Sequence, residues 1–474
     1  MIPRYVTRSF RLLAALVPAG LGAQSTDTLR LAVGDAVTRI LRTSDETRIA
    51  NAQIELTDAA VRSARAAALP QLRLNSTYTQ VLKNARAEIV GSVFGQAFTY
   101  NTNLRLEQSL FQGGRIMAAT QVAARAADAA LQSREETRAQ LAVGAQRVYL
   151  NALFTARIAD IQQRNLALAD ERLAQVQQLE QAGRSSRYDV LRARVERANL
   201  EPLALQAESD RALAELELKR LLDIPVDQPV VLTTSLDPQR VQDMARDAAA
   251  DASAVGVRPA VRAAEHTARA RAAGVRVARA DLLPTISASF TFGYLALPSS
   301  PGFPSRLGET SNAYCPAGSV GTRVCQNNGW FPDRNFGLQM SWPLFDGLRA
   351  KGQIDLAQAQ AKIADLQLRQ TREQATIDIA DAHAELVRAQ AAFAARATNV
   401  SEAEEAFELA TLRAERGIGT QLEVSDAQFA LLNARSTEAR ATFDLYLAVA
   451  EFARVRVKPI PLPDGGVAAA GETR

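Results

Sequence analysis

Four short segments of the chain alternate between apolar and polar residues with the period of two that is typical of β-strands. In residues 285–294, Ile, Ala, Phe, Phe and Tyr share one face, while Thr, Ser, Ser, Thr and Gly share the other. The same alternation, weakest in the first segment, occurs in residues 71–80, 100–110 and 336–342. We therefore predict two β-hairpins, over residues 71–112 and 284–346. Such alternation is typical of strands in a membrane-spanning barrel, but a half-buried strand of a soluble sheet shows it too.

A helical period dominates two long segments without proline, from Ile116 to about Ala182 and from Leu348 to about Arg416. At about 1.5 Å per residue, a helix of this length spans roughly 100 Å. The second segment has a heptad seam of large residues, each followed three positions later by alanine except at Arg396: Ile379, Leu386, Phe393, Val400 and Phe407. This pattern predicts close coiled-coil packing rather than a ligand site.

Each long helix is expected to end at a glycine, Gly183 or Gly417, because glycine readily takes the left-handed conformation that closes a helix. A second helix then runs back along the first. The two predicted helical hairpins therefore cover residues 115–223 and 348–456. A linker that includes a short β-like Val-Val-Leu run follows the first hairpin and extends to residue 238.

This order of elements occurs twice, and each half begins with an Ala/Arg-rich helix, at residues 30–69 and 255–282. Each β-hairpin opens at Leu-Pro and closes at Leu-Phe-x-Gly, and each turn glycine precedes an acidic-Val pair by six residues. A fixed-order internal repeat is strong evidence for architecture. We assign a first repeat to residues 24–238, a second repeat to residues 239–458, and a Pro/Gly-rich C-terminal tail to residues 459–474.

Residues 1–23 predict a cleaved signal peptide, with three arginines, an apolar stretch over residues 12–21 and a small-residue cleavage point at Ala23. A membrane anchor fits less well, because its apolar stretch would need about 20 residues. Cleavage removes three arginines and no acid, so the net charge falls from +4 to +1. A chain with so little net charge gives no electrostatic case for a nucleic-acid partner.

The sequence offers little chemistry of its own. Cys315 and Cys325 lie in the long polar loop of the second β-hairpin, and in an exported protein this spacing predicts a local disulfide. The only histidines, His266 and His383, lie in helical segments without cysteines or paired acids at metal-ligand spacing. No phosphate-binding loop, nucleophile elbow or HExxH motif is present. We therefore expect neither an enzyme nor a cofactor or metal site.

Together these features resemble the outer membrane efflux protein family, the TolC-like channels. The resemblance covers nearly the whole mature chain and rests on the order of four motifs: Leu110-Phe111-Gln112-Gly113, Leu344-Phe345-Asp346-Gly347, Asp189-Val190 and Glu423-Val424. It implies a mainly α fold with transmembrane β-strands, in which each chain contributes four strands to a trimeric 12-stranded outer-membrane β-barrel. The long helices would then form an α-helical coiled-coil barrel in the periplasm.

The resemblance also implies a passive exit duct of a tripartite efflux or type I secretion system, which exports small molecules or proteins. Its implied partners are two further copies of the chain, a periplasmic adaptor, an inner-membrane pump and the lipid of the outer membrane. Elementary physics supports self-association, because four strands cannot close a barrel and an open edge in lipid leaves backbone groups unpaired. Eight strands enclose a filled interior, whereas twelve leave a lumen.

The family resemblance assigns a gate to the periplasmic tip. Acidic residues just after the second turn narrow the entrance in this family, and through Gly417 they match Glu423 and Asp426. Three copies would place six carboxylates around one aperture, which would attract cations. The alternative interpretation is an ordinary acidic first turn of a helix, where negative charge is favourable.

The first turn supplies the expected partners of this gate. Asp189 and three arginines, Arg184, Arg187 and Arg192, are predicted to form charge pairs that hold the aperture closed, although solvated surface arginines are an equal alternative. Because Gly419 and Gln421 carry no basic side chain, such pairs should use the arginines of the first turn.

The same turns are the expected docking surface for the adaptor, through Gly183, Ser185, Ser186, Gly417, Gly419 and Thr420. A different class of function remains as an alternative, namely a periplasmic coiled-coil protein with a structural or adhesive role and soluble β-hairpins. Such a protein would fractionate without detergent, whereas a channel would require it.

Overall fold

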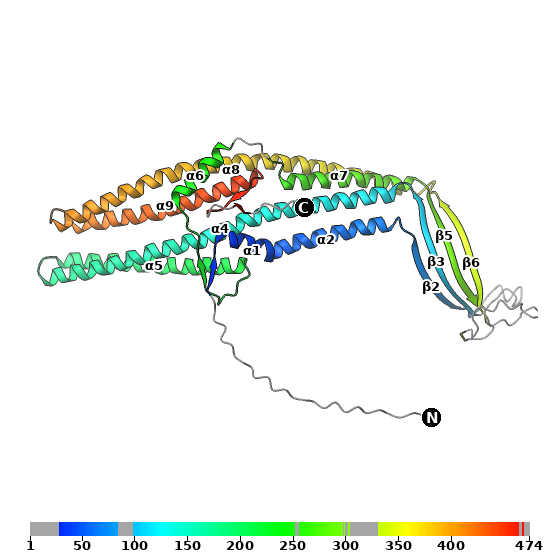
Figure 1. Ribbon diagram of the computed structural model, residues 1–474, viewed down its shortest axis with the longest axis horizontal. Coiled ribbons are helices and arrows are strands. Elements are labelled where there is room, and N and C mark those ends of the chain that lie inside the picture. The colour runs from blue at the N-terminus through cyan, green and yellow to red at the C-terminus, as the bar shows by residue number, and fades with distance from the viewer. Residues whose placement is uncertain are drawn as a thin grey trace, which may run out of the picture.

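The computed structural model describes residues 28–83, 98–251, 256–296, 298, 302–303, 330–463 and 467–468. The molecule is elongated, with a bundle of long helices that meets a curved four-stranded sheet at one end (Figure 1). The predicted signal peptide and the predicted Cys315–Cys325 disulfide lie outside the described residues. Across the described part of the chain, no helix combines the length and the apolar character needed to cross a membrane.

Two helical hairpins form the long axis. Helices α4 (Arg115–Gln181) and α8 (Arg349–Glu415) have 67 residues each. Helices α5 (Arg187–Leu221) and α9 (Gln421–Val455) have 35 residues each. The long helices begin and end within two residues of the positions where the sequence places them, and α5 and α9 each start four residues after the turn glycine. The heptad seam of α8 is buried at its centre, at Ala382, Leu386, Ala389 and Phe393.

The sheet consists of four antiparallel strands in the order β2-β3-β5-β6. They are β2 (Gln71–Gln80), β3 (Phe98–Gln112), β5 (Thr285–Ala296) and β6 (Trp330–Ser341). The two predicted β-hairpins therefore pair with each other through β3 and β5. Gly293 makes this contact possible, because a Cβ atom there would lie only 2.5 Å from the Cβ of Asn103.

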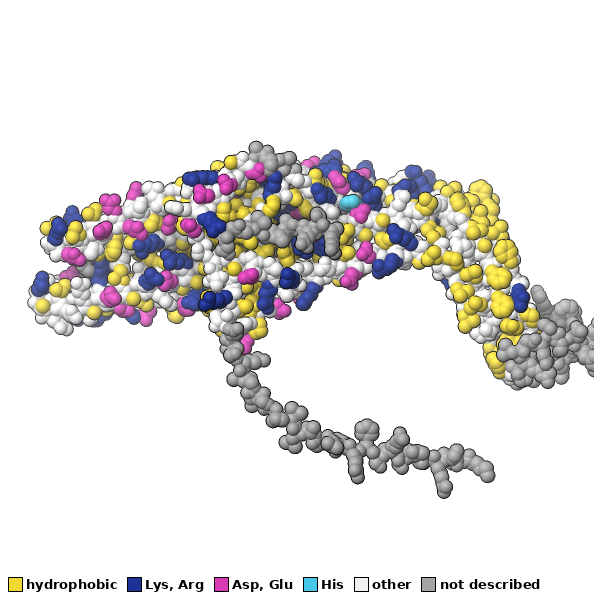
Figure 2. Space-filling view, viewed as in Figure 1, with side chains coloured by type: hydrophobic (Ala, Val, Ile, Leu, Met, Phe, Trp, Pro, Cys, Tyr) yellow, Lys and Arg dark blue, Asp and Glu magenta, His cyan; other side chains and the backbone are white. Residues whose placement is uncertain are grey.

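The strand register separates a polar face of the sheet from an apolar one. Asn75, Asn103, Gly293 and Asp333 are consecutive neighbours across the strands, and the next row on this face is Arg73, Arg105, Thr291 and Asn335. The opposite face carries large apolar side chains that are exposed in the single chain, for example Leu74 at 70% and Phe336 at 75%. Figure 2 shows hydrophobic side chains over much of the sheet, whereas charged side chains are spread over the helices.

The junctions between strands and long helices explain the repeated Leu-Phe-x-Gly motif. Gly113 has a φ of 59° and lies against Leu283, so that an added Cβ would come within 2.8 Å of the Leu283 Cβ. Gly114 follows with a φ of 79°, and α4 begins at the next residue. In the second half, Leu348 takes the position of Gly114 with a φ of 68°. The Asp346 carboxylate accepts a hydrogen bond from the Ala350 amide at 2.8 Å and so caps α8 there.

The first helix predicted from sequence, over residues 30–69, is wrong as a single element. The segment forms β1 (Leu29–Leu31), α1 (Val33–Thr43) and α2 (Asp45–Ala66). The break falls at Ser44, whose hydroxyl accepts a hydrogen bond from the Thr47 amide at 3.2 Å and caps α2. Strand β1 pairs in parallel with β4 (Val230–Leu232), the β-like run of the linker.

The helix predicted at residues 255–282 is shorter than expected. It consists of α7 (Pro259–Arg279) and a 3₁₀ turn at Ala280–Leu282. A separate helix that the sequence pattern did not reveal, α6 (Pro238–Ala250), precedes it. Part of the Pro/Gly-rich C-terminal tail forms β7 (Ile460–Pro461) and β8 (Val467–Ala468).

The hydrophobic core lies midway along the helices, where β1, β4, α1 and α6 pack around α4 and α9. Two fully buried tyrosines anchor it. The Tyr149 hydroxyl donates to the Leu31 carbonyl at 2.7 Å and accepts from the Thr234 amide at 3.2 Å. The Tyr446 hydroxyl lies 2.8 Å from the Pro461 carbonyl and 3.1 Å from Gln146 Oε1. These bonds fix the short strands to the long helices and satisfy polar groups that burial would otherwise penalise.

Candidate functional site

The turns between α4 and α5 and between α8 and α9 lie near each other at the end of the molecule opposite the sheet (Figure 1). Gly183 and Gly417 end the long helices with φ angles of 70° and 74°. The Arg184 amide donates to the Leu179 carbonyl at 2.8 Å, and the Ile418 amide donates to the Arg413 carbonyl at 3.0 Å. Both turns thus close by the same left-handed C-terminal motif.

Asp189 caps its own helix. Its carboxylate accepts hydrogen bonds from the Ser186 hydroxyl at 2.7 Å, the Ser186 amide at 2.9 Å and the Ser185 hydroxyl at 3.1 Å. These bonds, led by that from the Ser186 side chain, lower the pKa of Asp189. Within the described residues Asp189 makes no ion pair with Arg184, Arg187 or Arg192, and Arg187 instead lies 3.6 Å from Glu180. The charge of Arg192 also helps to lower the pKa of Asp189, and the charge pairs expected to hold the aperture closed remain a prediction.

The second turn is capped differently. The Glu423 amide donates to the Thr420 hydroxyl at 3.2 Å, and Glu423 Oε2 lies 3.6 Å from Arg413 Nε on α8. Glu423 thus has a partner on its own hairpin, and the expected pairs with the arginines of the first turn remain a prediction. Asp426 is exposed, one residue after the buried Ser425. The two acids that match the family gate therefore lie at exposed positions in the first two turns of α9.

A polar cluster that sequence reasoning missed joins the two helical hairpins close to these turns. Arg172 of α4 donates to the Ser425 hydroxyl at 2.8 Å and to Gln428 Oε1 at 3.3 Å. The Ser425 hydroxyl donates to Glu196 of α5 at 3.2 Å, and Arg172 Nη1 lies 3.7 Å from the same carboxylate. The Arg172 side chain is only 11% exposed. We call these four residues the tip cluster.

Burial lowers the pKa of Arg172, and the charge of Glu196 opposes this change. An arginine nevertheless stays protonated at neutral pH, so the tip cluster holds a buried cation against one carboxylate. Next to it lies a groove of about 350 Å³ between the hairpins, with Tyr188 and Leu422 at its walls. Several apolar side chains at the tip are exposed: Tyr188, Leu191, Ile418, Leu422 and Phe429.

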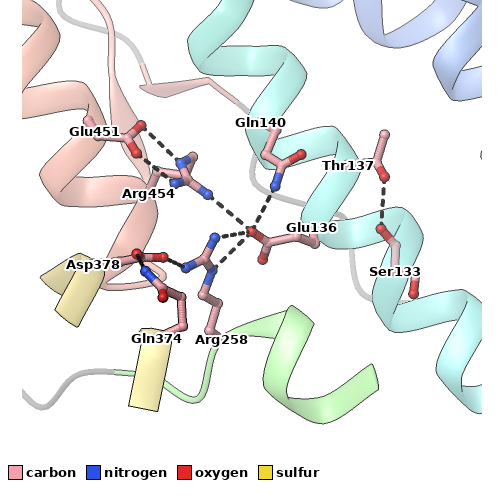
Figure 3. Close-up of polar contacts among 9 residues, drawn as sticks. All are labelled: Ser133, Glu136, Thr137, Gln140, Arg258, Gln374, Asp378, Glu451 and Arg454. Atoms are coloured by element: carbon pink, nitrogen blue, oxygen red, sulfur yellow. Dashed lines mark hydrogen bonds and ion pairs between the residues drawn. The ribbon is translucent and has the colours of Figure 1, made fainter. Parts of the chain in front are cut away.

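A second ionic cluster lies midway along the molecule, and we call it the central cluster (Figure 3). Glu136 of α4 is 8% exposed and accepts hydrogen bonds from Arg258 at 2.7 and 3.0 Å and from Arg454 at 3.1 Å. Arg258 also pairs with Asp378 of α8, and Arg454 pairs with Glu451 at 2.6 Å. The cluster therefore ties α4, α8, α9 and the segment before α7 together.

Burial alone would raise the pKa of Glu136, but hydrogen bonds and charges from Arg258 and Arg454 outweigh it, so the pKa is lowered. The same balance lowers the pKa of Asp378. Both carboxylates are ionised at neutral pH. The central cluster thus holds the two helical hairpins together midway along their length. Beyond it, the helices extend to the tip.

The histidines do not form a metal centre. His266 Nδ1 lies 3.4 Å from Asp128, and the His383 ring packs 5.8 Å from that of Phe452. Within the described ranges, no group of three or more His, Cys, Asp or Glu side chains is placed to hold a metal ion.

A sequence model of the outer membrane efflux protein family matches residues 37–223 and 252–455. The chain belongs to this family. These matched ranges contain both helical hairpins and all four strands of the sheet. Membership in the outer membrane efflux protein family identifies the chain as an outer-membrane channel protein and not an enzyme.

The chain is also similar to individual proteins. It is 26% identical to the outer membrane protein OprJ of Pseudomonas aeruginosa over 381 residues, which cover 79% of this chain and 73% of OprJ. Its fold matches the crystal structure of the outer membrane protein VceC of Vibrio cholerae with a TM-score of 0.69 at 21% identity, over 90% of this chain and 95% of VceC. It also matches the open state of the outer membrane channel MtrE of Neisseria gonorrhoeae with a TM-score of 0.69 at 18% identity, over 90% of this chain and 89% of MtrE. At these identities the structural matches establish the fold.

Proposed function

We propose that three copies of this efflux protein assemble into a duct that crosses the outer membrane and the periplasm. The observation that carries the proposal is the open four-stranded sheet with one polar and one apolar face. Strands β2 and β6 are its edges in the described residues. In lipid such edges must pair with another strand, and three sheets supply the twelve strands that leave a lumen. The apolar face would contact lipid, and the polar face with Asn75 and Asn103 would line the passage.

The helices would continue this passage into the periplasm. The equal lengths of α4 and α8, and of α5 and α9, support two internal repeats, each of which contributes one helical hairpin. Six hairpins in a trimer would form the wall of an α-helical barrel. The N-terminal signal peptide expected at residues 1–23 supports export across the inner membrane.

The tip is the proposed gate. Glu423 and Asp426 would form a ring of six carboxylates at the periplasmic entrance. The tip cluster supports this assignment, because its bonds hold the two hairpins of each chain together and must change if the hairpins move apart. MtrE has been captured in an open state, which supports a fold with more than one tip conformation.

The exposed turns are the proposed docking surface for a periplasmic adaptor, which would connect the duct to an inner-membrane pump. Small molecules or proteins would pass through it, in a tripartite efflux or a type I secretion system. The relation to OprJ and the family match favour efflux.

Conductance in planar bilayers tests the proposal. The mature protein, extracted with detergent and purified as an oligomer, should give small, stable channels with a preference for cations. A protein that fractionates without detergent and forms no channel would favour the alternative, a coiled-coil protein with a structural or adhesive role. Cross-linking across β2 and β6 separately reports whether three copies assemble.

A further inference from the structure

A groove of about 800 Å³ lies between α4 and α9, where the segment that leads into α6 crosses them. We call it the lateral groove. It is distant from the tip cluster and is lined mainly by apolar side chains, among them Leu150, Leu153, Phe154, Ile161, Leu236 and Val400. A volume of about 300–1,000 Å³ with mostly apolar walls and few polar groups is typical of small-molecule sites.

One wall of the lateral groove is aromatic. The rings of Phe154 and Phe443 stack with centroids 5.8 Å apart, and both residues line the groove. The Arg440 guanidinium lies 5.5 Å and 5.3 Å from the centroids of the two rings. These rings therefore already accept a cation, as electron-rich aromatic faces do.

Glu438 is a charged residue of this groove for which the described residues show no ion pair. Its side chain is half-buried, and within the described residues its carboxylate has neither a hydrogen bond nor an ion pair. The nearby cations are engaged elsewhere, since Arg435 pairs with Glu404 at 2.9 Å and Arg157 lies 3.7 Å from Asp160. Burial raises the pKa of Glu438, and the charge of Glu404 raises it further, against the smaller effects of Arg157 and Arg435.

We propose that the lateral groove binds a hydrophobic organic cation, with its apolar body against Leu153 and Phe154 and its positive charge beside Glu438. A half-buried carboxylate that forms no close ion pair favours a cation, and the apolar walls favour a bulky ligand with few hydrogen-bonding groups. The site lies beside the helical wall and not at the proposed gate. This binding site does not depend on the proposed channel function, and a binding experiment tests the site separately from channel activity.

Isothermal titration calorimetry on the detergent-purified protein tests the site with tetraphenylphosphonium, whose charge does not change with pH. The neutral triphenylphosphine oxide serves as the matched probe. We expect saturable binding of the cation, and weaker or no binding of the neutral probe. Glu438→Gln should weaken cation binding about tenfold, because it removes the charge and keeps the shape. Binding should also weaken as the pH falls toward the raised pKa of Glu438, because protonation removes the negative charge of its carboxylate.

Two further variants test whether the probes bind in the lateral groove. Ala439→Phe places a bulky side chain in the groove and should abolish binding of both probes, whereas Glu385→Gln, on α8 outside the groove, should leave binding unchanged. Equal binding by the wild type and by both groove variants would place the cation elsewhere and overturn the proposal. Absence of binding to the folded wild-type protein would overturn it as well. If two copies of the Ala439→Cys variant then form a disulfide with each other, the groove is covered by a neighbouring copy of the chain.

Discussion

Arg172 and Ser425 are 253 positions apart in the sequence, yet the guanidinium of one donates to the hydroxyl of the other at 2.8 Å. One residue belongs to the first helical hairpin and the other to the second. Their bond is therefore a direct measure of how closely the two hairpins approach at the tip. Its position, next to the exposed acids Glu423 and Asp426, connects the packing of a single chain to the proposed aperture.

Arg172→Ala should loosen the tip. Loss of hydrogen bonds from a charged donor costs about 2 kcal/mol and leaves the Glu196 carboxylate without its cation. We expect larger or more frequent channel openings in single-channel recordings. Arg164→Ala is the matched control, because Arg164 is an exposed arginine of α4 whose ion pair in the described part of the chain lies along its own helix, with Asp160. Identical recordings from both variants and the wild type would exclude the tip cluster from gating.

Replacement of Glu423 and Asp426 by alanine should remove the preference for cations. Six carboxylates would be lost from the proposed aperture, and Arg413 would lose its partner 3.6 Å away. Reversal potentials in a salt gradient report this change. The double variant Asp365→Ala/Glu373→Ala removes the same charge from exposed positions of α8 far from the tip. If both double variants keep the selectivity of the wild type, the acidic gate is wrong.

Glu136→Gln should destabilise the folded chain by about 3 kcal/mol, because it leaves two buried arginines without their shared carboxylate. Thermal unfolding followed by circular dichroism measures the change. Glu385→Gln is a suitable comparison, since Glu385 forms an exposed ion pair with Arg388 within one helix turn, and such pairs contribute less than about 1 kcal/mol. Equal melting temperatures for the two variants would contradict a stabilising central cluster.

The central cluster also predicts a dependence of stability on pH. The pKa of Glu136 is lowered from 4.5 and that of Asp378 from 3.8, so the folded state binds protons less readily than the unfolded state. Their contribution to the free energy of unfolding is complete above these ordinary values and is lost as the pH falls through the lowered ones. The melting temperature should therefore fall in acid below about pH 4.5, and fall less in Glu136→Gln. A parallel decline in both proteins would assign the acid sensitivity to other groups.

The two glycines of the first junction should respond differently to alanine. Both have positive φ, which costs a non-glycine residue about 1 kcal/mol. Gly113→Ala also forces a Cβ to within 2.8 Å of Leu283, whereas nothing lies within 4 Å of a Cβ at Gly114. Gly113→Ala should lower the melting temperature more than Gly114→Ala does. The opposite order would show that the packing against Leu283 can relax.

Much of the fold is visible in the sequence because it depends on local periodicity. The heptad seam around Leu386, the alternation of residues 285–294 and the glycines at 183 and 417 each determine structure within a few residues. The pairing of β1 with β4 depends on contacts about 200 positions apart, for which a three-residue strand leaves no pattern. The break at Ser44 was visible in principle, since serine followed by Asp45 and Glu46 is a helix start.

The candidate site could be predicted only in part from the sequence, because its contacts also join residues far apart in the chain. Asp189 and Glu423 follow their turns at a fixed spacing, but the partners of their carboxylates depend on three-dimensional geometry. Arg172 lies between the buried residues Ala169 and Val176 at heptad spacing, so a charge in an apolar seam was the available signal. Glu136, seven residues before the buried Val143, gave the same signal. What such a charge meets across the interface cannot be inferred from one helix alone.

The open edges of β2 and β6 have a consequence for biogenesis. In the described part of a folded single chain, the outer edges of β2 and β6 are unpaired and one face of the sheet is apolar and exposed, an arrangement that readily pairs with a wrong neighbour. The barrel closes correctly only if the edges of three copies pair with each other before they pair with other strands. The rate of this closure therefore depends on the concentration of chains at the membrane. For this protein the vulnerable step in production is then assembly and not the folding of the helices, so that efficient delivery of chains to the membrane should raise the yield.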